Sequence, residues 1–386
     1  MSQCRIPFNK PGLTGNELRY VADAFTRGHT AGDGFFTSAC HALLERELGV
    51  RKALLTTSCT HALEMAALLL DIQEGDEVIV PSFTFVSTAN AFALRGARPV
   101  FADIRRDTLN LDEAALESLI GPRTRAIVPV HYAGVACEMT TILEIAARHG
   151  VAVVEDNAHG LFARYQGRYL GSFGCLAAQS FHETKNIMCG EGGALLVNDP
   201  RYAARAEILR QKGTNRGRFL RGEVDKYTWV DLGSSFLPSD ILAAFLLAQL
   251  EKREEIQARR RKVWDYYDEH LRGWARQYGV LQPTVPDGCE HSCHMYYLLM
   301  PSLAARQNLI DHLRERSILG VFHYQPLHLS EMGARFGGVP GQCPVSEWAA
   351  ARVLRLPFYN DLSEADQAYV VDAVCEFTGF SAGTVA

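Results

Sequence analysis

Short apolar runs alternate with helix-like segments through the first half of the chain, and this alternation limits the folds open to it. Runs rich in β-branched residues predict strands at residues 53–56, 77–80, 98–101, 126–130, 151–155, 176–180 and 194–197. Between them, helical patterns cover residues 60–70, 87–94, 112–120 and 139–149. Several strands are apolar at nearly every position, as expected when both faces are covered. The pattern predicts an α/β fold whose mostly parallel sheet is flanked by helices and binds ligands at the carboxyl ends of its strands.

The C-terminal part of the chain predicts a second, smaller domain. One long amphipathic helix is expected over residues 239–271 as a connector, with Ser239 or Asp240 as its cap. The segments that predict an α+β domain beyond it are 293–301, 309–315, 321–324 and 364–377. Because a chain of 386 residues exceeds one ordinary core, we predict a large domain with an N-terminal arm at residues 1–250 and a small C-terminal domain at residues 251–386.

The composition excludes several classes of protein. Hydrophobic residues at 47% and charged residues at 22% are typical of a globular protein. The formal net charge of −5, without a long run of Lys and Arg, argues against a nucleic-acid partner. The apolar runs are too short to span a bilayer and no signal pattern opens the chain, so no membrane partner is expected. The ten cysteines are scattered without a disulfide framework or a complete zinc-finger spacing, which predicts a cytoplasmic protein without a metal site.

Two segments carry the candidate catalytic groups. Asp156 follows the strand at 151–155, and Lys185 lies one strand further on, in a polar turn before the glycine-rich segment 190–193. This order suits pyridoxal phosphate, because a lysine can form a Schiff base with the cofactor aldehyde. An acid beside the pyridine nitrogen keeps a proton there, so that the ring can accept the electrons of a carbanion. Alone, Asp156 would be interpreted as a helix N-cap and Lys185 as a surface lysine; together, on a βαβ background, they predict an enzyme.

The phosphate and the ring of such a cofactor need further partners. Backbone amides at a helix start and nearby hydroxyls bind phosphate, which points to Thr60, the amide of His61, and Ser180. Hydroxyls in front of helices also serve as plain caps, so this interpretation depends on the neighbouring motifs. Phe85 could stack on a flat ring or belong to the core.

The chain resembles the DegT/DnrJ/EryC1/StrS family of sugar-nucleotide aminotransferases over residues 6–357. The resemblance implies an aspartate-aminotransferase-type fold (fold type I, a PLP-dependent transferase). It also implies pyridoxal 5'-phosphate as the cofactor and a homodimer with its active site at the subunit interface. By position, the implied cofactor residues are the aldimine lysine Lys185, its pyridinium partner Asp156, the ring-stacking Phe85, and Thr60, His61 and Ser180 around the phosphate.

Three positions depart from the family's usual pattern. Where the family has glutamine near the cofactor's phenolic oxygen, this chain has His159, which could donate a hydrogen bond or carry charge. In many members an asparagine reaches the phosphate of the neighbouring subunit. The corresponding segment 233–237 reads Gly-Ser-Ser-Phe-Leu, so Ser235 would take that role with a shorter reach. The glycine often found before Thr60 is Cys59, which need not disturb a phosphate bound through backbone amides.

Six matching segments, several of them outside the cofactor motif, narrow the resemblance to members that aminate a dTDP sugar. These segments are 58–60, 66–72, 129–139, 181–186, 212–216 and 224–229. They imply L-glutamate as donor and dTDP-4-keto-6-deoxyglucose as acceptor, giving dTDP-4-amino-4,6-dideoxygalactose by ping-pong exchange at Lys185. Sister transaminases that give the gluco epimer or a 3-amino sugar share the backbone motifs and stay open as alternatives. A family dehydratase would have histidine in place of Lys185, and a non-catalytic regulator would usually carry a DNA-binding module.

Overall fold

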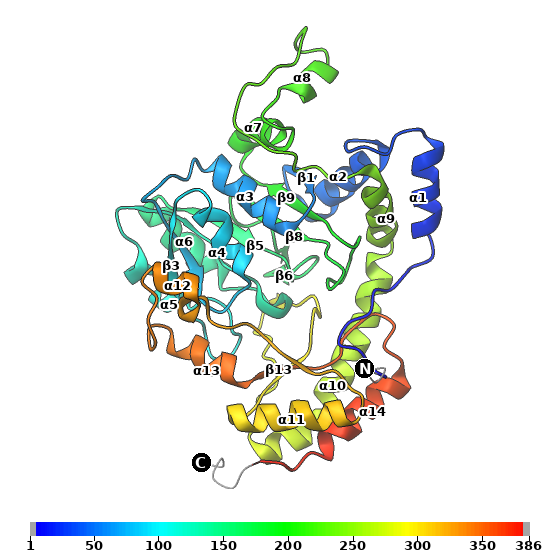
Figure 1. The fold of residues 1–386 in the computed structure, drawn as a ribbon, viewed down its shortest axis with the longest axis vertical. Coiled ribbons are helices and arrows are strands. Elements are labelled where there is room, and N and C mark those ends of the chain that lie inside the picture. The colour runs from blue at the N-terminus through cyan, green and yellow to red at the C-terminus, as the bar shows by residue number, and fades with distance from the viewer. Residues whose placement is uncertain (1–4, 381–386) are drawn as a thin grey trace.

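Seven strands form the central sheet of the computed structural model, which describes residues 5–380 (Figure 1). In sheet order they are β1 (Lys52–Thr56), β9 (Gly193–Val197), β8 (Leu176–Ser180), β5 (Ala152–Asp156), β4 (Thr124–Ile127), β2 (Glu77–Pro81) and β3 (Arg98–Ala102). β9 runs antiparallel to β1 and β8, and the other neighbouring pairs are parallel. The predicted α/β fold with a mostly parallel sheet is therefore confirmed, with small shifts at the strand ends.

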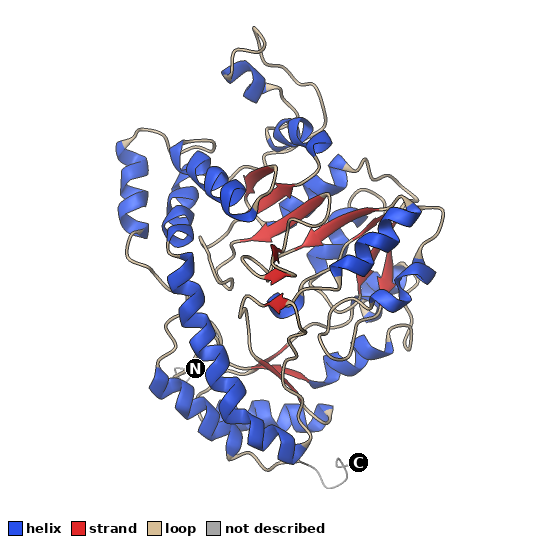
Figure 2. Ribbon diagram, turned by 180° about the vertical axis from the view of Figure 1, so that it is seen from behind, coloured by secondary structure: helices blue, strands red, loops and turns tan. Residues whose placement is uncertain are grey.

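Helices cover both faces of this sheet, because successive strand residues point to opposite sides. Leu54 and Leu176 pack toward one layer of helices, whereas Leu55 and Ala177 pack toward the other. The first layer contains α3 (Cys59–Leu69), α4 (Val86–Ala93) and α7 (Pro200–Arg210). The second layer contains α2 (Phe35–Leu48), α9 (Asp240–Glu251) and α6 (Met139–His149), with α1 (Glu17–Thr26) packed against α9. Figure 2 shows the sheet between these helices, from behind.

Short elements complete this part of the chain. The predicted helix at 112–120 is a short α-helix, α5 (Glu113–Leu116), continued by the 3-10 helix η1 (Glu117–Leu119). The other short elements here are η2 (Tyr132–Gly134), β6 (Arg164–Tyr165), β7 (Arg168–Tyr169), α8 (Arg216–Leu220) and β10 (Cys289–Glu290). β6 pairs with both β7 and β10, and α8 projects beyond α7 at the top of Figure 1.

The single long connector helix predicted at 239–271 is wrong. The chain forms α9 and then α10 (Arg253–Tyr278), separated at Lys252, whose backbone leaves the helical region (φ −103°, ψ 16°). The Lys252 amide donates to the carbonyl of Gln249 at 3.0 Å, which tightens the last turn of α9. No proline or glycine marks this break, so the apolar periodicity could not reveal it. Within residues 5–380, no helix, α10 included, is both long and apolar enough to cross a membrane.

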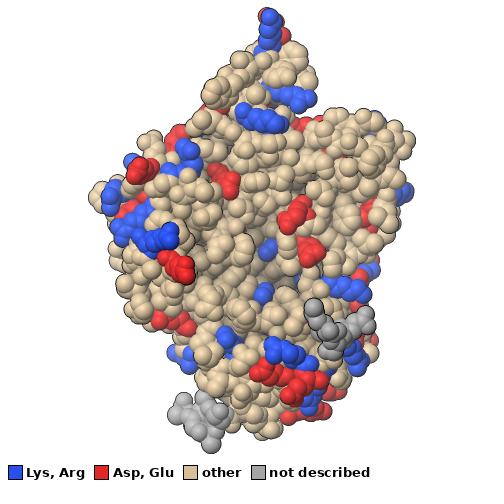
Figure 3. Space-filling model, in the orientation of Figure 1, with Lys and Arg blue, Asp and Glu red and all other residues tan. Residues whose placement is uncertain are grey.

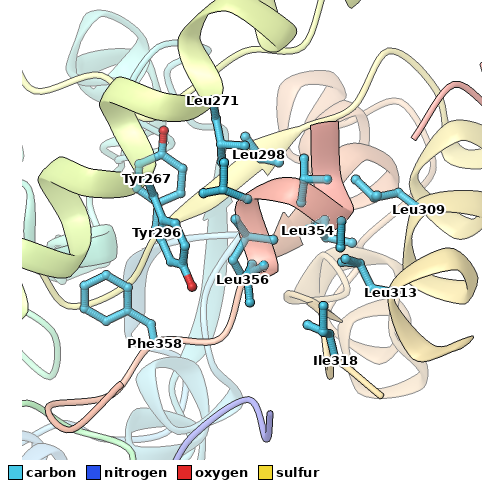
Figure 4. Packing of buried hydrophobic residues seen from close by; sticks show 14 of the residues in the cluster. Tyr267, Leu271, Tyr296, Leu298, Leu309, Leu313, Ile318, Leu354, Leu356 and Phe358 are labelled. Atoms are coloured by element: carbon cyan, nitrogen blue, oxygen red, sulfur yellow. The ribbon is translucent and has the colours of Figure 1, made fainter. Parts of the chain in front are cut away.

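A three-stranded antiparallel sheet and its helices surround the C-terminal half of α10. The strand order is β11 (Tyr297–Leu299), β13 (Val353–Arg355) and β12 (Val321–Phe322). Of the helices, α11 (Leu303–Glu315) and α14 (Glu364–Cys375) share a core with α10. In contrast, η3 (Leu327–Leu329), α12 (Glu331–Arg335) and α13 (Pro344–Arg352) pack beside residues of the large sheet and its loops. Figure 4 shows Tyr267 and Leu271 of α10 packed with Leu298 and Leu354 of this sheet. The domain boundary between residues 250 and 251 stays a prediction.

Candidate active site

A cavity of about 820 Å³ opens at the carboxyl ends of the central strands, where strands of an α/β sheet commonly bind ligands. Figure 3 shows the hollow in the middle of the molecular face, with basic side chains inside it. Two of the cavity residues are the last residues of central strands: Asp156 ends β5, and Ser180 ends β8. Six of the predicted residues line this cavity: Thr60, Phe85, Asp156, His159, Ser180 and Lys185.

Asp156 is held as a buried carboxylate by donors on neighbouring segments. Its Oδ2 accepts a hydrogen bond from the Thr88 hydroxyl at 2.7 Å, and its Oδ1 accepts one from the Ala158 amide at 3.2 Å. The Thr84 hydroxyl lies 2.9 Å from that of Thr88 and donates to it, because the single hydroxyl proton of Thr88 is used on Asp156. Burial raises the pKa of Asp156, against the hydrogen bonds and the charge of Lys185. A cationic N–H group placed at this carboxylate would relieve its burial.

Lys185 lies in a tight turn after β8, where its amide donates to the carbonyl of His182 at 2.9 Å. Burial lowers the pKa of its amine to about 8; Cys59 and Asp156 oppose this shift, and the charge of Arg355 adds to it. A lysine with such a pKa keeps a fraction of uncharged amine near neutral pH and can act as a nucleophile or as a proton carrier.

The start of α3 forms a cradle of hydroxyls and backbone amides. Ser58 caps the helix by accepting a hydrogen bond from the His61 amide at 3.1 Å, and the hydroxyls of Thr60 and Ser87 lie 2.7 Å apart. Gly193 passes so close that a Cβ there would lie 2.3 Å from the carbonyl carbon of Ser58. Amides and hydroxyls at a helix N-terminus suit a phosphate. The His61 amide already has the Ser58 hydroxyl as its partner and His61 does not line the cavity, so its phosphate role stays a prediction.

Three stacked histidines form another wall of the cavity. The ring of His159 lies 4.2 Å from that of His294, and its buried Nδ1 has no hydrogen-bond partner among the described residues. His294 Nδ1 donates to the Asn186 side-chain oxygen at 2.8 Å, and His323 Nδ1 lies 2.8 Å from the Tyr132 hydroxyl. Burial lowers the pKa of all three imidazoles well below the usual value, so they are neutral near pH 7. The unpaired Nδ1 of His159 is available for hydrogen bonding, and the role of His159 at the cofactor stays a prediction.

Two predicted residues have unexpected surroundings. Phe85 is not a core residue: it precedes α4 with 57% of its surface exposed, which leaves its ring available at the cavity. Ser235 is exposed and lies outside the cavity lining, on a segment that bridges to Gln211. Its predicted contact with a neighbouring subunit's phosphate therefore stays a prediction that needs a second copy of the chain.

Several cavity residues had no recognisable sequence signal. The Asp156 partner Thr88 lies in the first turn of α4, and the cavity residues His294, His323 and Arg355 come from segments far downstream. Lone histidines at strand ends are usually structural, and an arginine in a short strand resembles a surface residue. Only the packing of the C-terminal sheet against the large one brings them to the cavity.

The lining suits pyridoxal phosphate. It offers an amine with a lowered pKa, a buried carboxylate, an exposed aromatic ring and a helix-start cradle. The unpaired Nδ1 of His159 adds a polar atom that a ligand oxygen can satisfy. Lys185 and Asp156 would hold the reactive carbon and the ring nitrogen, and Ser58, Thr60 and Ser180 the phosphate.

Comparisons with known proteins agree on one family. The model of the DegT/DnrJ/EryC1/StrS aminotransferase family matches residues 12–375. An uncharacterised protein of Methanocaldococcus jannaschii is 34% identical over 96% of both chains. A protein of Streptococcus pneumoniae, described as a sugar aminotransferase and solved in its PMP form, superposes with a TM-score of 0.90 at 26% identity, over 96% of this chain and 98% of that one. Helicobacter pylori PseC, an aminotransferase involved in pseudoaminic acid biosynthesis, superposes with a TM-score of 0.88 at 27% sequence identity, over 96% of this chain and 98% of that one.

Proposed function

Because the chain belongs to the DegT/DnrJ/EryC1/StrS aminotransferase family, we propose that it transfers the amino group of L-glutamate to the 4-keto carbon of dTDP-4-keto-6-deoxyglucose. The product would be dTDP-4-amino-4,6-dideoxygalactose. Family membership confirms the predicted enzyme class, the aspartate-aminotransferase-type fold and the cofactor, pyridoxal 5'-phosphate. The observation that carries the proposal is the placement of Lys185 and Asp156 in one cavity with a helix-start cradle.

When bound, the cofactor supplies a carbonyl that accepts an amino group and a ring that accepts electrons. The protein supplies the rest from its own side chains. The Lys185 Nζ can take a proton from a substrate carbon beside it and return that proton to a second carbon, because its pKa of about 8 lets both forms exist near neutral pH. Asp156, held by Thr88, would orient an N–H cation bound beside its carboxylate. The neutral imidazoles of His159 and His294 add no competing positive charge beside that amine.

The choice of sugar is supported by the segments that resemble the C4-aminating members, among them 129–139 and 224–229. Residues 132–134 form η2, whose Tyr132 holds His323 at the cavity wall. Part of the resemblance therefore lies next to the site rather than within the cofactor motif. The sister reactions, which give the gluco epimer or a 3-amino sugar, use the same cofactor residues and are separated only by the product.

The test is to incubate the purified protein with pyridoxal phosphate, L-glutamate and dTDP-4-keto-6-deoxyglucose, and to identify the sugar product by NMR. We expect an axial amine at C4. An equatorial amine, or an amine at C3, would contradict the assignment of the sugar and leave the aminotransferase chemistry intact. If glutamate changes the absorbance of the bound cofactor but no amino sugar forms, the acceptor is wrong.

We also expect a homodimer in which Ser235 reaches the partner's cofactor phosphate. Supporting this, Ser235 is exposed outside its own cavity, and apolar residues near it face solvent, with Trp229 at 74% and Leu232 at 54% exposure. Light scattering of the holoenzyme checks the mass, and a monomer of 42.8 kDa would contradict the proposal. The cytoplasmic location stays a prediction.

The lowered pKa of Lys185 predicts how cofactor capture depends on pH. Because the uncharged amine is the nucleophile, cofactor-free protein should capture pyridoxal phosphate about tenfold faster for each pH unit up to a pKa of about 8, and at a constant rate above it. Capture is followed by the absorbance of the bound cofactor after rapid mixing. A rate that keeps rising to pH 10, as for an ordinary exposed lysine, would contradict the buried position of the amine.

A further inference from the structure

The turn that carries Lys185 is shaped by backbone hydrogen bonds within its own segment. The Lys185 amide donates to the carbonyl of His182 at 2.9 Å, and the Glu183 amide donates to the carbonyl of Gly190 at 2.8 Å. These bonds define the turn but do not tie it to the C-terminal part of the chain. A side chain that links the turn to that part can therefore fix where the Lys185 amine lies in the cavity.

Asn186, the residue after Lys185, makes such a link. It is buried, with 6% of its surface exposed. Its Nδ2 donates to the carbonyl of Ser292 at 2.6 Å, and its Oδ1 accepts a hydrogen bond from His294 Nδ1 at 2.8 Å. These partners lie 106 and 108 positions further along the chain, shortly before β11. One amide group therefore joins the Lys185 turn to the segment that leads into the C-terminal sheet.

The Ser292 carbonyl sets the orientation of this amide. Because a carbonyl only accepts hydrogen bonds, the nitrogen of the Asn186 amide faces Ser292 and its oxygen faces His294. His294 consequently carries its proton on Nδ1. Its Nε2 has no hydrogen-bond partner within residues 5–380 and is an acceptor in a residue that lines the cavity. Burial lowers the pKa of this imidazole well below the usual value, which keeps it neutral.

The segment that receives Asn186 is itself fixed by other parts of the fold. The side chain of Gln257, on α10, also donates to the Ser292 carbonyl, at 2.6 Å. The Ser292 amide donates to the carbonyl of Gly134 at 3.2 Å, and the Ser292 hydroxyl donates to the carbonyl of His159 at 2.6 Å. The hydrogen bond from Asn186 therefore ends on a fixed point and not on a free loop.

We propose that Asn186 is a positioning residue for Lys185, which ties the catalytic turn to segment 292–294 and holds His294 as a neutral hydrogen-bond acceptor in the same cavity. The inference rests on the proposed function, because it concerns the lysine to which that function assigns the nucleophile and the proton carrier. A displacement of about 1 Å at a reacting group can slow its step on the order of 100-fold. Asn186 thus controls the placement of the amine and takes no part in the chemistry itself.

Asn186→Asp distinguishes this role from a purely structural one. A protonated aspartate offers one donor and one acceptor, as the amide does, so it can keep the hydrogen bonds to Ser292 and His294. An ionised aspartate has no donor and turns an oxygen toward the Ser292 carbonyl, so the tie to segment 292–294 is lost. The same variant is therefore expected to hold the turn at low pH and to release it at high pH.

The new carboxyl group is expected to have a raised pKa. Burial raises the pKa of Asp156 in the same cavity, although two donors and the charge of Lys185 favour its ionised form. The new group would have the neutral His294 as a donor and a carbonyl on its other side. The cations that act on His294 are Lys185, Arg260 and Arg355, and they oppose the rise without supplying the missing donor. The protonated form, which fits the site, is therefore lost as the pH rises through this pKa.

The test measures the capture of pyridoxal phosphate by cofactor-free protein, followed by absorbance after rapid mixing from about pH 6 to about pH 9. We expect Asn186→Ala to capture the cofactor roughly 10- to 100-fold more slowly than the parent protein at each pH. Asn186→Asp should match the parent rate within about threefold at the acid end and fall toward the rate of Asn186→Ala as the pH rises. The ratio of variant to parent rate at the same pH removes the titration of Lys185 itself.

Asn198→Ala is the matched control. The Asn198 Nδ2 donates to the carbonyls of Gly171 and Gly174 at 3.1 and 2.8 Å, so this asparagine also ties separate segments together, but it does not line the cavity. Its capture rate should stay within about twofold of the parent rate. Circular dichroism at each pH checks that the variants are folded. Because the change with pH is measured within one folded protein, a general loss of stability does not reproduce it.

The loaded enzyme gives a second measurement. The same amine moves the proton in both half-reactions, so single-turnover rates with L-glutamate and with the keto sugar should fall in Asn186→Ala by factors that agree within about threefold. The Kd for L-glutamate should stay within about threefold, because placement of the amine affects the rate and not substrate binding.

The outcomes separate the inference from the proposed function. Capture by Asn186→Ala within about twofold of the parent rate, or a ratio for Asn186→Asp that does not change with pH, would overturn the inference. A parent protein that captures no pyridoxal phosphate, or that captures it and transfers no amino group, would instead overturn the proposed function.

Discussion

Lys185→Ala is expected to abolish aminotransfer, with a loss on the order of 10⁴-fold or more in kcat, because the same Nζ serves as nucleophile and as proton carrier. The variant should fold normally, since burial already disfavours the ammonium form and the buried carboxylate of Asp156 keeps its hydrogen bonds from Thr88 and Ala158. Turnover is measured with glutamate and the keto sugar. Borohydride reduction followed by mass spectrometry should place the pyridoxyl group on Lys185 in the parent protein.

The matched control for this loss is Lys262→Ala. Lys262 is exposed on α10, far from the cavity lining, and its replacement should change kcat by less than about twofold. Added methylamine should restore part of the activity of Lys185→Ala, because a free amine can carry the proton that Nζ carries. Turnover of Lys185→Ala near the parent rate, or a pyridoxyl group on a different lysine, would show that the catalytic lysine has been misassigned.

Asp156→Asn is expected to lower kcat by roughly 10²- to 10³-fold, the effect of removing one preorganised electrostatic partner. Asparagine keeps the shape of the side chain but carries no charge, so it cannot hold an N–H cation in the buried position where Thr88 and Ala158 fix the carboxylate. Thr88→Val should cause a smaller loss, because the carboxylate remains and loses only one donor. Both variants are measured in the complete reaction at saturating substrates.

Asp112→Asn is the control for this change. Asp112 caps α5 by accepting a hydrogen bond from the Ala114 amide at 3.1 Å, outside the cavity lining, and asparagine caps helices about as well as aspartate. Its activity should match that of the parent protein. If Asp156→Asn keeps more than about a tenth of the parent kcat, the carboxylate is structural and the role proposed for it fails.

The large sheet could be predicted because each of its strands carries its own local signal. Near-continuous apolar runs such as residues 176–180 and 194–197 are buried on both faces, so composition alone marks them. The break at Lys252 between α9 and α10 had no such signal, because it arises where one helix leaves the large sheet and the next enters the C-terminal core. Tertiary packing there overrides a continuous helical pattern.

The residues of the candidate site likewise fall into those that the sequence could reveal and those that it could not. Lys185 and Asp156 were visible because each follows a strong strand, and the carboxyl ends of neighbouring strands meet at one edge of a sheet. Thr88 could not be recognised, since a threonine within a helix shows no sign of the carboxylate that its hydroxyl will reach. His61 illustrates the opposite case: its backbone amide, which was expected to bind the phosphate, already donates a hydrogen bond to the capping hydroxyl of Ser58.

The sequence by itself determined the α/β architecture, the family and the two residues proposed for the chemistry, because these depend on local patterns and on the order of motifs along the chain. Only the tertiary structure decided what surrounds them. It lowers the pKa of Lys185 to about 8, holds His159 uncharged against His294, and brings Arg355 from a distant strand into the same cavity. Each of these effects depends on burial and on charges that meet across the fold. The spacing of residues along one segment encodes neither the burial nor the meeting of the charges.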